Sequence, residues 1–185
     1  MSRFRIILNP LNPAKACPRL VSRHHGGVKL YFLRHADALP GSDDARRPLS
    51  PHGCEQAEEL GKFLAKAGIL FDAAYTSPLV RARETARLLL DAMDSASRVR
   101  AESVDALRNE TSPNEFEVWL ATLPDAKRVL LVGHEPTLSE RVRAMLGVSR
   151  PSAFEFSKGA VACVDLIDRR TGCLKLLITP KALGL

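Results

Sequence analysis

Short apolar runs alternate with longer helical patterns along most of this chain. The runs 28–34 (VKLYFLR), 73–76 (AAYT) and 128–133 (RVLLVG) are apolar or rich in β-branched residues, and each predicts a buried strand. A helical pattern follows each strand, beginning near residues 51, 78 and 137. This alternation predicts an α/β domain with a mostly parallel central sheet.

The ends of the helices carry recognisable signals. Ser50 and Ser77 each stand as an N-cap before a proline at the first helical position, and Gly68 is expected to end the first helix. Thr137 and Glu140 resemble a capping box for the third helix. All three helices are therefore predicted to begin directly after a strand.

The two ends of the chain differ in character. Two further apolar runs, 160–168 and 173–179, predict a closing β-hairpin, so we expect a single domain over residues 28–185. Residues 1–27 hold basic residues, several prolines and only a short apolar patch. We interpret them as a disordered or mis-started N-terminal extension.

Charge and composition narrow the classes of function. The formal charge is +6, but residues 1–27 contain five basic residues and no acid, so the remainder carries only about +1. A nucleic-acid partner is therefore not expected. No segment approaches the roughly 18 to 20 apolar residues of a membrane span, and four scattered cysteines fit reduced thiols. We expect a cytoplasmic monomer with no membrane attachment.

Three strand-to-helix junctions carry side chains that can face an anion. His35 follows the first strand, Arg81 follows the second, and His134 follows the third. The carboxyl ends of parallel strands meet at one edge of a sheet, where ligands of open α/β folds bind. We therefore expect these side chains to converge.

The residue types indicate phosphate chemistry. Arg34 and Arg81 offer planar guanidinium groups that match phosphoryl oxygens, and Arg47 could close the pocket from the next loop. A neutral His35 is a competent nucleophile toward phosphorus, and His134 can donate to the oxygens where charge accumulates. No metal or cofactor is expected, because the arginines would repel a cation.

Four stretches carry a resemblance to a known family. LRHADA (33–38), TSPLVRARETA (76–86) and LLVGHEP (130–136) resemble the three signatures of the histidine phosphatase superfamily, in the same order. RPLSPHGCEQA (47–57) resembles its SixA-type phosphohistidine phosphatase branch. The resemblance runs from Val28 to the last strand. It implies a three-layer α/β/α fold like that of phosphoglycerate mutase.

The resemblance also implies roles for individual residues. His35 would be phosphorylated in turn, Arg34, Arg81 and His134 would hold the phosphoryl group, and Arg47 would be a further pocket arginine. The implied reaction has two steps, transfer of the phosphoryl group to His35 and hydrolysis of the phosphohistidine by water.

Two departures from the broader family bear on the substrate. Ala36 replaces a common glycine, which we interpret as a mark of the SixA-type branch. About 35 residues separate the second helix from the strand 128–133, so no large lid insertion is expected. An open pocket admits a phosphorylated protein side chain, and an imidazole leaving group needs less help from an acid than an alkoxide. Protein phosphohistidine is therefore the expected substrate.

Alternatives stay open at this point. Glu110 is the first candidate for a general acid, with Asp105 and Asp37 behind it. A small-molecule phosphomonoesterase acting on a sugar phosphate or nucleotide would use the same chemistry. A phosphate-binding module without turnover would keep the pocket, but it would not need a nucleophile at His35.

Overall fold

The computed structural model describes residues 27–93, 99–168 and 170–185. Residues 1–26 of the expected N-terminal extension lie outside the described residues. Within the described part, six strands form one mixed sheet in the order β3-β2-β4-β1-β5-β6. The strands are β1 (Lys29–Arg34), β2 (Ala73–Thr76), β3 (Ala101–Ser103), β4 (Arg128–Gly133), β5 (Val161–Leu166) and β6 (Gly172–Ile178).

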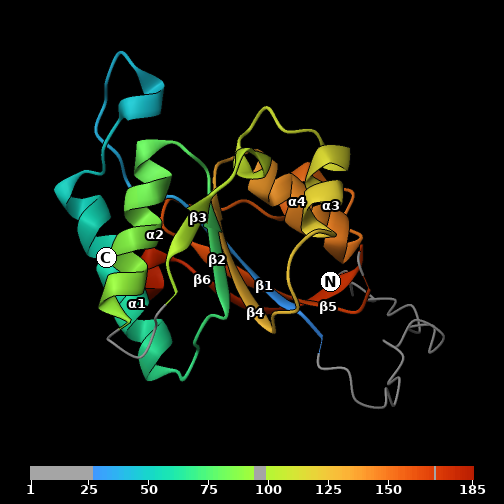
Figure 1. Cartoon of the computed structure of the whole chain (residues 1–185). Helices are drawn as coiled ribbons and strands as arrows, with labels where there is room; N and C mark the ends of the chain where they lie inside the picture. Colours follow the sequence, from blue (N-terminus) through green and yellow to red (C-terminus); the bar gives the residue numbers. More distant parts are fainter. Residues whose placement is uncertain (1–26, 94–98, 169) are drawn as a thin grey trace, which may run out of the picture.

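Two helices cover each face of the sheet. They are α1 (Pro51–Lys66), α2 (Val80–Ala92), α3 (Pro113–Leu120) and α4 (Thr137–Leu146), and short 3-10 turns include η2 (Asp44–Arg46) and η3 (Asp105–Leu107). Figure 1 shows α1 and α2 on one side of the sheet and α3 and α4 on the other. The α/β class and the three-layer arrangement are confirmed.

The central strands are apolar on both faces because both faces are covered. Tyr31 and Leu33 of β1 pack in the core beneath α1 and α2, whereas Leu30 and Phe32 pack in the core beneath α3 and α4. Strands buried on both faces read as continuous apolar runs rather than as alternating ones. This explains why VKLYFLR contains so few polar residues.

The register of the parallel strands aligns their carboxyl ends. In the ladders, Arg34 of β1 lies opposite Gly133 of β4, and Thr76 of β2 lies opposite Val132 of β4. The residues that follow, His35, Ser77 and His134, therefore leave the sheet at one edge. The predicted parallel pairing is confirmed for β2, β4 and β1, and β3 adds a further parallel strand beside β2. The predicted hairpin adds β5 and β6 in antiparallel pairings.

The first predicted helix begins and ends where the sequence indicates. The Ser50 side chain accepts a hydrogen bond from the Gly53 amide, and proline stands in the first turn. Gly68, just beyond the helix, has a φ of 70°, a conformation that glycine adopts at little cost. In contrast, α2 begins at Val80, two residues later than predicted.

The capping box predicted for α4 is wrong. The Thr137 hydroxyl donates instead to the side chain of Asn109, and no side chain caps α4. A capping box does occur at α3, where the Ser112 side chain accepts from the Glu115 amide and the Glu115 carboxylate accepts from the Ser112 amide. The sequence pattern is the same in both places, and tertiary contacts decide which one forms.

No large lid is present in the part of the chain that the structure describes. Between α2 and β4 this part forms only β3, η3 and α3, as the sequence length predicted. Among the described helices, none has the length and apolar character needed to cross a bilayer.

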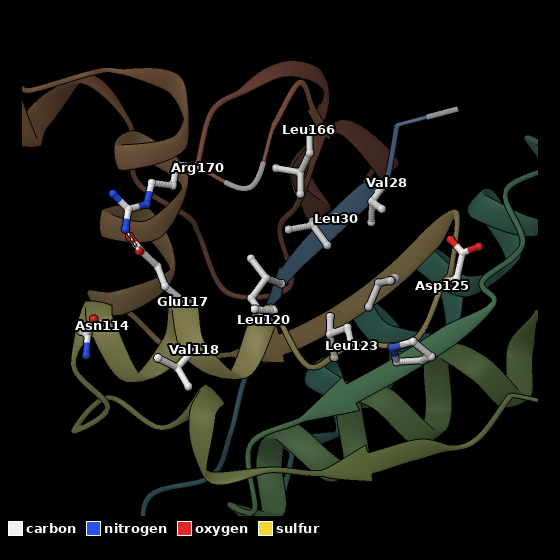
Figure 2. A pocket seen from close by; sticks show the side chains of 13 residues that line it. Val28, Leu30, Asn114, Glu117, Val118, Leu120, Leu123, Asp125, Leu166 and Arg170 are labelled. Carbon is white, nitrogen blue, oxygen red and sulfur yellow. Dashed lines mark ion pairs between the residues drawn. The ribbon is translucent and has the colours of Figure 1, made fainter. Parts of the chain in front are cut away.

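A cavity of about 460 Å³ lies far from the predicted site (Figure 2). Its wall includes Val28 and Leu30 at the start of β1, Val129 at the start of β4, and Leu120 of α3. These strand positions are at the amino ends, so the cavity lies at the sheet edge opposite to His35 and His134.

Candidate active site

The three predicted junctions meet at the carboxyl edge of the sheet. The Nε atom of Arg81, on α2, donates to Nε2 of His35 across 3.2 Å. The imidazole rings of His35 and His134 lie with their centroids 5.1 Å apart. The structure therefore brings together side chains that are 46 and 99 positions from one another along the chain.

The backbone around His35 is fixed from three sides. Its amide donates to the carbonyl of Gly133 in β4 (3.0 Å), and its own carbonyl accepts from the Gly159 amide (3.2 Å). The next amide, that of Ala36, donates to the Thr85 hydroxyl of α2 (3.0 Å). The position of this histidine therefore depends on the packed sheet and helix rather than on a free loop.

The hydrogen bonds of His35 define its tautomer. Nδ1 lies 2.8 Å from the Ala36 carbonyl oxygen, which can only accept, so Nδ1 carries the proton and Nε2 carries the lone pair. The pKa of His35 is lowered to about 4, chiefly by burial; the hydrogen bond to Ala36 opposes this change, and the nearby charges of Arg81 and Arg34 contribute to it. The ring is therefore neutral at pH 7.

His134 is held in a similar environment. Its Nε2 is hydrogen-bonded to the Ser77 hydroxyl at 2.8 Å, and its Nδ1 is buried with no partner among the described residues. Burial lowers the pKa of His134 to about 3, with contributions from His35 and Arg81. A buried ring nitrogen without a partner is costly, so this atom is suited to a ligand that completes its hydrogen bonding.

Arg34 contributes a second unsatisfied polar atom. One of its terminal nitrogens, Nη1, donates to the carbonyl of Phe156 at 2.6 Å, whereas its Nε is buried without a partner in the described part of the chain. Its positive charge lowers the pKa values of both histidines. Unpaired donors and positive charge together favour an anion at this edge of the sheet.

The predicted pocket residue Arg47 reaches the site only through another side chain. Arg81 donates from Nη1 to the Asp44 carbonyl (2.6 Å) and from Nη2 to Asp44 Oδ2 (3.0 Å). Arg47 donates from Nη1 to Asp44 Oδ1 (3.0 Å) and from Nε to the Leu39 carbonyl (2.8 Å). Partial burial raises the pKa of Asp44, but the bonds from Arg47 and Arg81 outweigh it and lower the pKa overall.

The candidate acids differ in their surroundings. Glu110 is exposed, and it follows Asn109, whose side chain donates to the Glu135 carbonyl beside His134. Asp105 accepts from Arg108, and Asp37 accepts from Lys158 and from the Ser50 hydroxyl. Because the carboxylates of Asp105 and Asp37 are engaged, Glu110 stays the first candidate.

The sequence pattern does not indicate three residues of the site. The pattern at Ser77 predicts only a helix cap, yet its hydroxyl contacts His134. Asp44 stands three residues before Arg47, and Lys158 is close enough to His35 to lower the pKa of that ring. The i, i+3 spacing of Asp44 and Arg47 was a usable signal for an ion pair, whereas nothing in the sequence marks Lys158.

The chain is similar in sequence to known proteins. A model of the histidine phosphatase superfamily (branch 1) matches residues 30–117. An uncharacterised protein of Picosynechococcus sp. (strain ATCC 27264 / PCC 7002 / PR-6) is 36% identical over 124 residues, which cover 64% of this chain and 73% of that protein. A 2,3-bisphosphoglycerate-dependent phosphoglycerate mutase of Streptococcus pneumoniae (strain CGSP14) is 45% identical over 74 residues, 36% of this chain but only 31% of the mutase.

Solved structures extend the similarity to the whole fold. The protein histidine phosphatase SixA complexed with tungstate has a TM-score of 0.75 and 24% identity, covering 84% of this chain and 99% of that one. A protein from Agrobacterium tumefaciens assigned as phosphohistidine phosphatase SixA has a TM-score of 0.70 and 26% identity, covering 83% and 99%. The chain belongs to the histidine phosphatase superfamily, and within that superfamily its structure is similar to the SixA-type proteins.

Proposed function

We propose that this protein is a metal-independent phosphatase that hydrolyses phosphohistidine on a protein, with His35 as the transient phosphoryl carrier. One observation supports this most strongly. The Ala36 carbonyl fixes the proton of His35 on Nδ1, so a lone pair remains on Nε2, and the ring stays neutral at pH 7. A neutral, oriented imidazole is what attack on phosphorus requires.

The surrounding donors suit the phosphoryl group. The unpaired Nε of Arg34 and Nδ1 of His134, when protonated, can donate to its oxygens, and Arg81 adds a second guanidinium. Such preorganised donors stabilise the charge that accumulates on the oxygens in the transition state. A divalent metal ion is not needed for this purpose, and two guanidinium groups beside the site would repel one.

The reaction proceeds in two balanced steps. Nε2 of His35 forms a bond to phosphorus while the bond from phosphorus to the substrate imidazole breaks, and the imidazole keeps the electron pair and takes a proton. A water molecule then forms a bond to phosphorus, the bond to Nε2 breaks, and inorganic phosphate leaves. The proton of the water passes to solvent or phosphate, and His35 regains its lone pair.

Two arguments favour phosphohistidine as the substrate: the access of a protein side chain to the site, and the ease with which imidazole leaves phosphorus. No large lid covers the described site, so a histidine on another protein could reach it. Imidazole departs from phosphorus with little assistance, whereas an ester oxygen needs a proton donor, and the best candidate donor, Glu110, is exposed. The similarity to SixA-type proteins, named for phosphohistidine phosphatase activity, points in the same direction.

A small-molecule phosphomonoesterase is the second candidate function. The 74-residue match to a phosphoglycerate mutase, an enzyme named for a small phosphorylated metabolite, favours it. The chemistry at His35 would be unchanged, but an ester substrate would place more demand on a proton donor.

A turnover assay decides between these functions. Phosphate release is measured on a phosphohistidine-bearing protein domain, on p-nitrophenyl phosphate and on a panel of phosphorylated metabolites, all with EDTA present. We expect the phosphohistidine protein to give the highest kcat/KM, and His35→Ala to abolish release. A metabolite with the higher kcat/KM would support the second function, and binding without release would support a phosphate-binding module.

A further inference from the structure

We propose that Asp44 is a latch that competes with the substrate phosphoryl group for Arg81. In the resting protein its carboxylate takes the position of a phosphoryl oxygen on the guanidinium, and Arg81 in turn covers the nucleophilic nitrogen of His35. Substrate must displace Asp44 before the reaction can begin. This inference rests on the proposed function, because it assigns His35 as the nucleophile.

The fork of Arg81 is already engaged by an anion. Its two terminal nitrogens donate to the carbonyl and to the Oδ2 atom of Asp44, at 2.6 and 3.0 Å. Nη2 thus binds one carboxylate oxygen and Nη1 is held by the backbone carbonyl of the same residue, so Asp44 occupies both terminal nitrogens that could bind phosphoryl oxygens. Arg81 exposes only 8% of its side chain, whereas Asp44 exposes 64%. The buried partner is thus fixed, and the exposed partner is the one that can leave.

The same arginine blocks the nucleophile. Its Nε donates to Nε2 of His35 at 3.2 Å, so the lone pair that should attack phosphorus is occupied. Attack requires Arg81 to turn its donors away from the ring and toward the phosphoryl oxygens. Asp44 opposes this movement, because it holds the far end of the guanidinium.

Asp44 lies on a loop that can move without breaking the sheet. The loop leaves and returns through a hydrogen bond from the Leu39 amide to the Pro48 carbonyl (2.9 Å) and an isolated bridge between Ala38 and Leu49. In Figure 1 this loop, in light blue at the top of the view, projects beyond the end of α2 and carries η2. The base is anchored, and the tip bearing Asp44 is held by Arg81 and Arg47.

The strength of the contact fits a displaceable latch. An ion pair with one mostly exposed partner changes an equilibrium by a factor of about 1.4 to 5. A phosphoryl dianion carries more charge than a carboxylate, and it can also accept from the unpaired donors of Arg34 and His134. Substrate can therefore displace Asp44, whereas a monoanion that meets Arg81 alone would have no such advantage.

The test measures equilibrium binding of inorganic phosphate by isothermal titration calorimetry, with wild type, Asp44→Asn and Asp43→Asn. We expect Asp44→Asn to bind phosphate about two- to fivefold more tightly, since it removes the competing charge. Asp43→Asn removes the same charge one residue away on the same loop. Among the described residues, the Asp43 carboxylate pairs only with Arg46, and it caps the Ala45 amide, a role that asparagine also fills. The Kd of Asp43→Asn should therefore stay within about 1.5-fold of wild type.

A second measurement, by NMR, follows Nε2 of His35, the nitrogen that Arg81 covers. The ¹⁵N resonance of His35 Nε2 should shift when phosphate is added to wild type, because the hydrogen bond from Arg81 is lost. Equal or weaker phosphate binding by Asp44→Asn would overturn the proposal, since Asp44 would then merely position Arg81. A tightening of the same size in Asp43→Asn would also overturn it, because general electrostatics would suffice.

These results are separable from the proposed function, because phosphate binding needs no turnover. A protein that hydrolyses phosphohistidine but shows no tightening in Asp44→Asn retains the proposed function and loses the latch. A protein in which Asp44→Asn tightens phosphate binding, but which hydrolyses no phosphohistidine, retains the latch and loses the proposed function.

Discussion

The Ser77 hydroxyl lies 2.8 Å from Nε2 of His134, although 57 residues separate the two in sequence. Both residues follow strands that end level in the sheet, β2 and β4, so the register of those strands brings them together. The hydrogen bond fixes the plane of the imidazole. It also leaves Nδ1 as the ring nitrogen available to a ligand.

Replacing Ser77 by alanine should therefore affect both stability and binding. We expect the free energy of unfolding to fall by about 1 to 3 kcal/mol, because a buried ring nitrogen loses its partner. The Kd for inorganic phosphate should rise as the ring becomes free to turn. Urea denaturation and calorimetry measure the two effects. Ser103→Ala, at an exposed position at the end of β3, is the control, and equal effects in both variants would contradict this role.

Gly53 should not tolerate a side chain although it lies within a helix. A Cβ atom there would stand 1.9 Å from the carbonyl oxygen of Asp37, in the segment that follows His35. Alanine normally favours helix, but here the backbones must separate, and we expect a loss of more than about 2 kcal/mol in unfolding free energy. Glu55→Ala, exposed on the same helix, should change it by less than about 0.5 kcal/mol. A stable Gly53→Ala protein would refute the close packing of α1 against the site.

Stability should decrease as the pH falls below 6.5. The folded protein holds His35 and His134 neutral, with pKa values of about 4 and about 3, because both rings are buried. The unfolded chain binds protons at these histidines from about pH 6.5 downward, so between these values it binds more protons than the folded chain. Each histidine then lowers the free energy of unfolding by up to about 1.4 kcal/mol per pH unit.

Urea denaturation between pH 7 and pH 5 measures this slope. His35→Gln should reduce it, because one of the two buried rings is then absent. Stability that does not vary across this window would show that the two rings are not held neutral.

Glu110→Gln should slow the hydrolysis of a phosphate ester much more than the hydrolysis of phosphohistidine. If the exposed carboxyl group protonates an ester oxygen, the variant loses about tenfold or more in kcat on an alkyl phosphate such as a sugar phosphate, whose alkoxide leaving group needs a proton. Hydrolysis of phosphohistidine should change by less than about twofold, because imidazole needs little assistance. Glu102→Gln, on the exposed edge strand β3, is the matched control. Equal losses on both substrates would contradict this distinction.

Much of the fold followed from local patterns. The runs that became β1, β2 and β4 are all short and apolar, and a helix start follows each, so the parallel pairing and the convergence of His35, Arg81 and His134 could be predicted. The similarity of three ordered motifs to one superfamily gave the remaining architecture. Both predictions depend on residues that are close together in the chain.

The contacts that could not be predicted join hydrogen-bonding side chains to partners that are distant in the chain. Thr137 has the sequence pattern of a capping residue, but Asn109, on a separate segment, takes its hydroxyl. Ser77 precedes a proline like an N-cap, but α2 begins three residues later, and the Ser77 hydroxyl bonds His134 as well as the Leu79 amide. The contact of Asp44 with Arg81 depends on the course of a surface loop, and the hydrophobic pattern of the sequence does not predict that course.

The most direct test is a single-turnover reaction that looks for phosphate on His35. Enzyme in excess over phosphorylated substrate is quenched within milliseconds into alkaline denaturant, because protonation of the imidazole would promote loss of the phosphoryl group in acid, and the peptides are analysed by mass spectrometry. We expect transient phosphorylation of His35 that decays as inorganic phosphate appears, and none in His35→Gln. Phosphate release by His35→Gln at the wild-type rate, or a phosphoryl group on a different residue, would contradict the proposed mechanism.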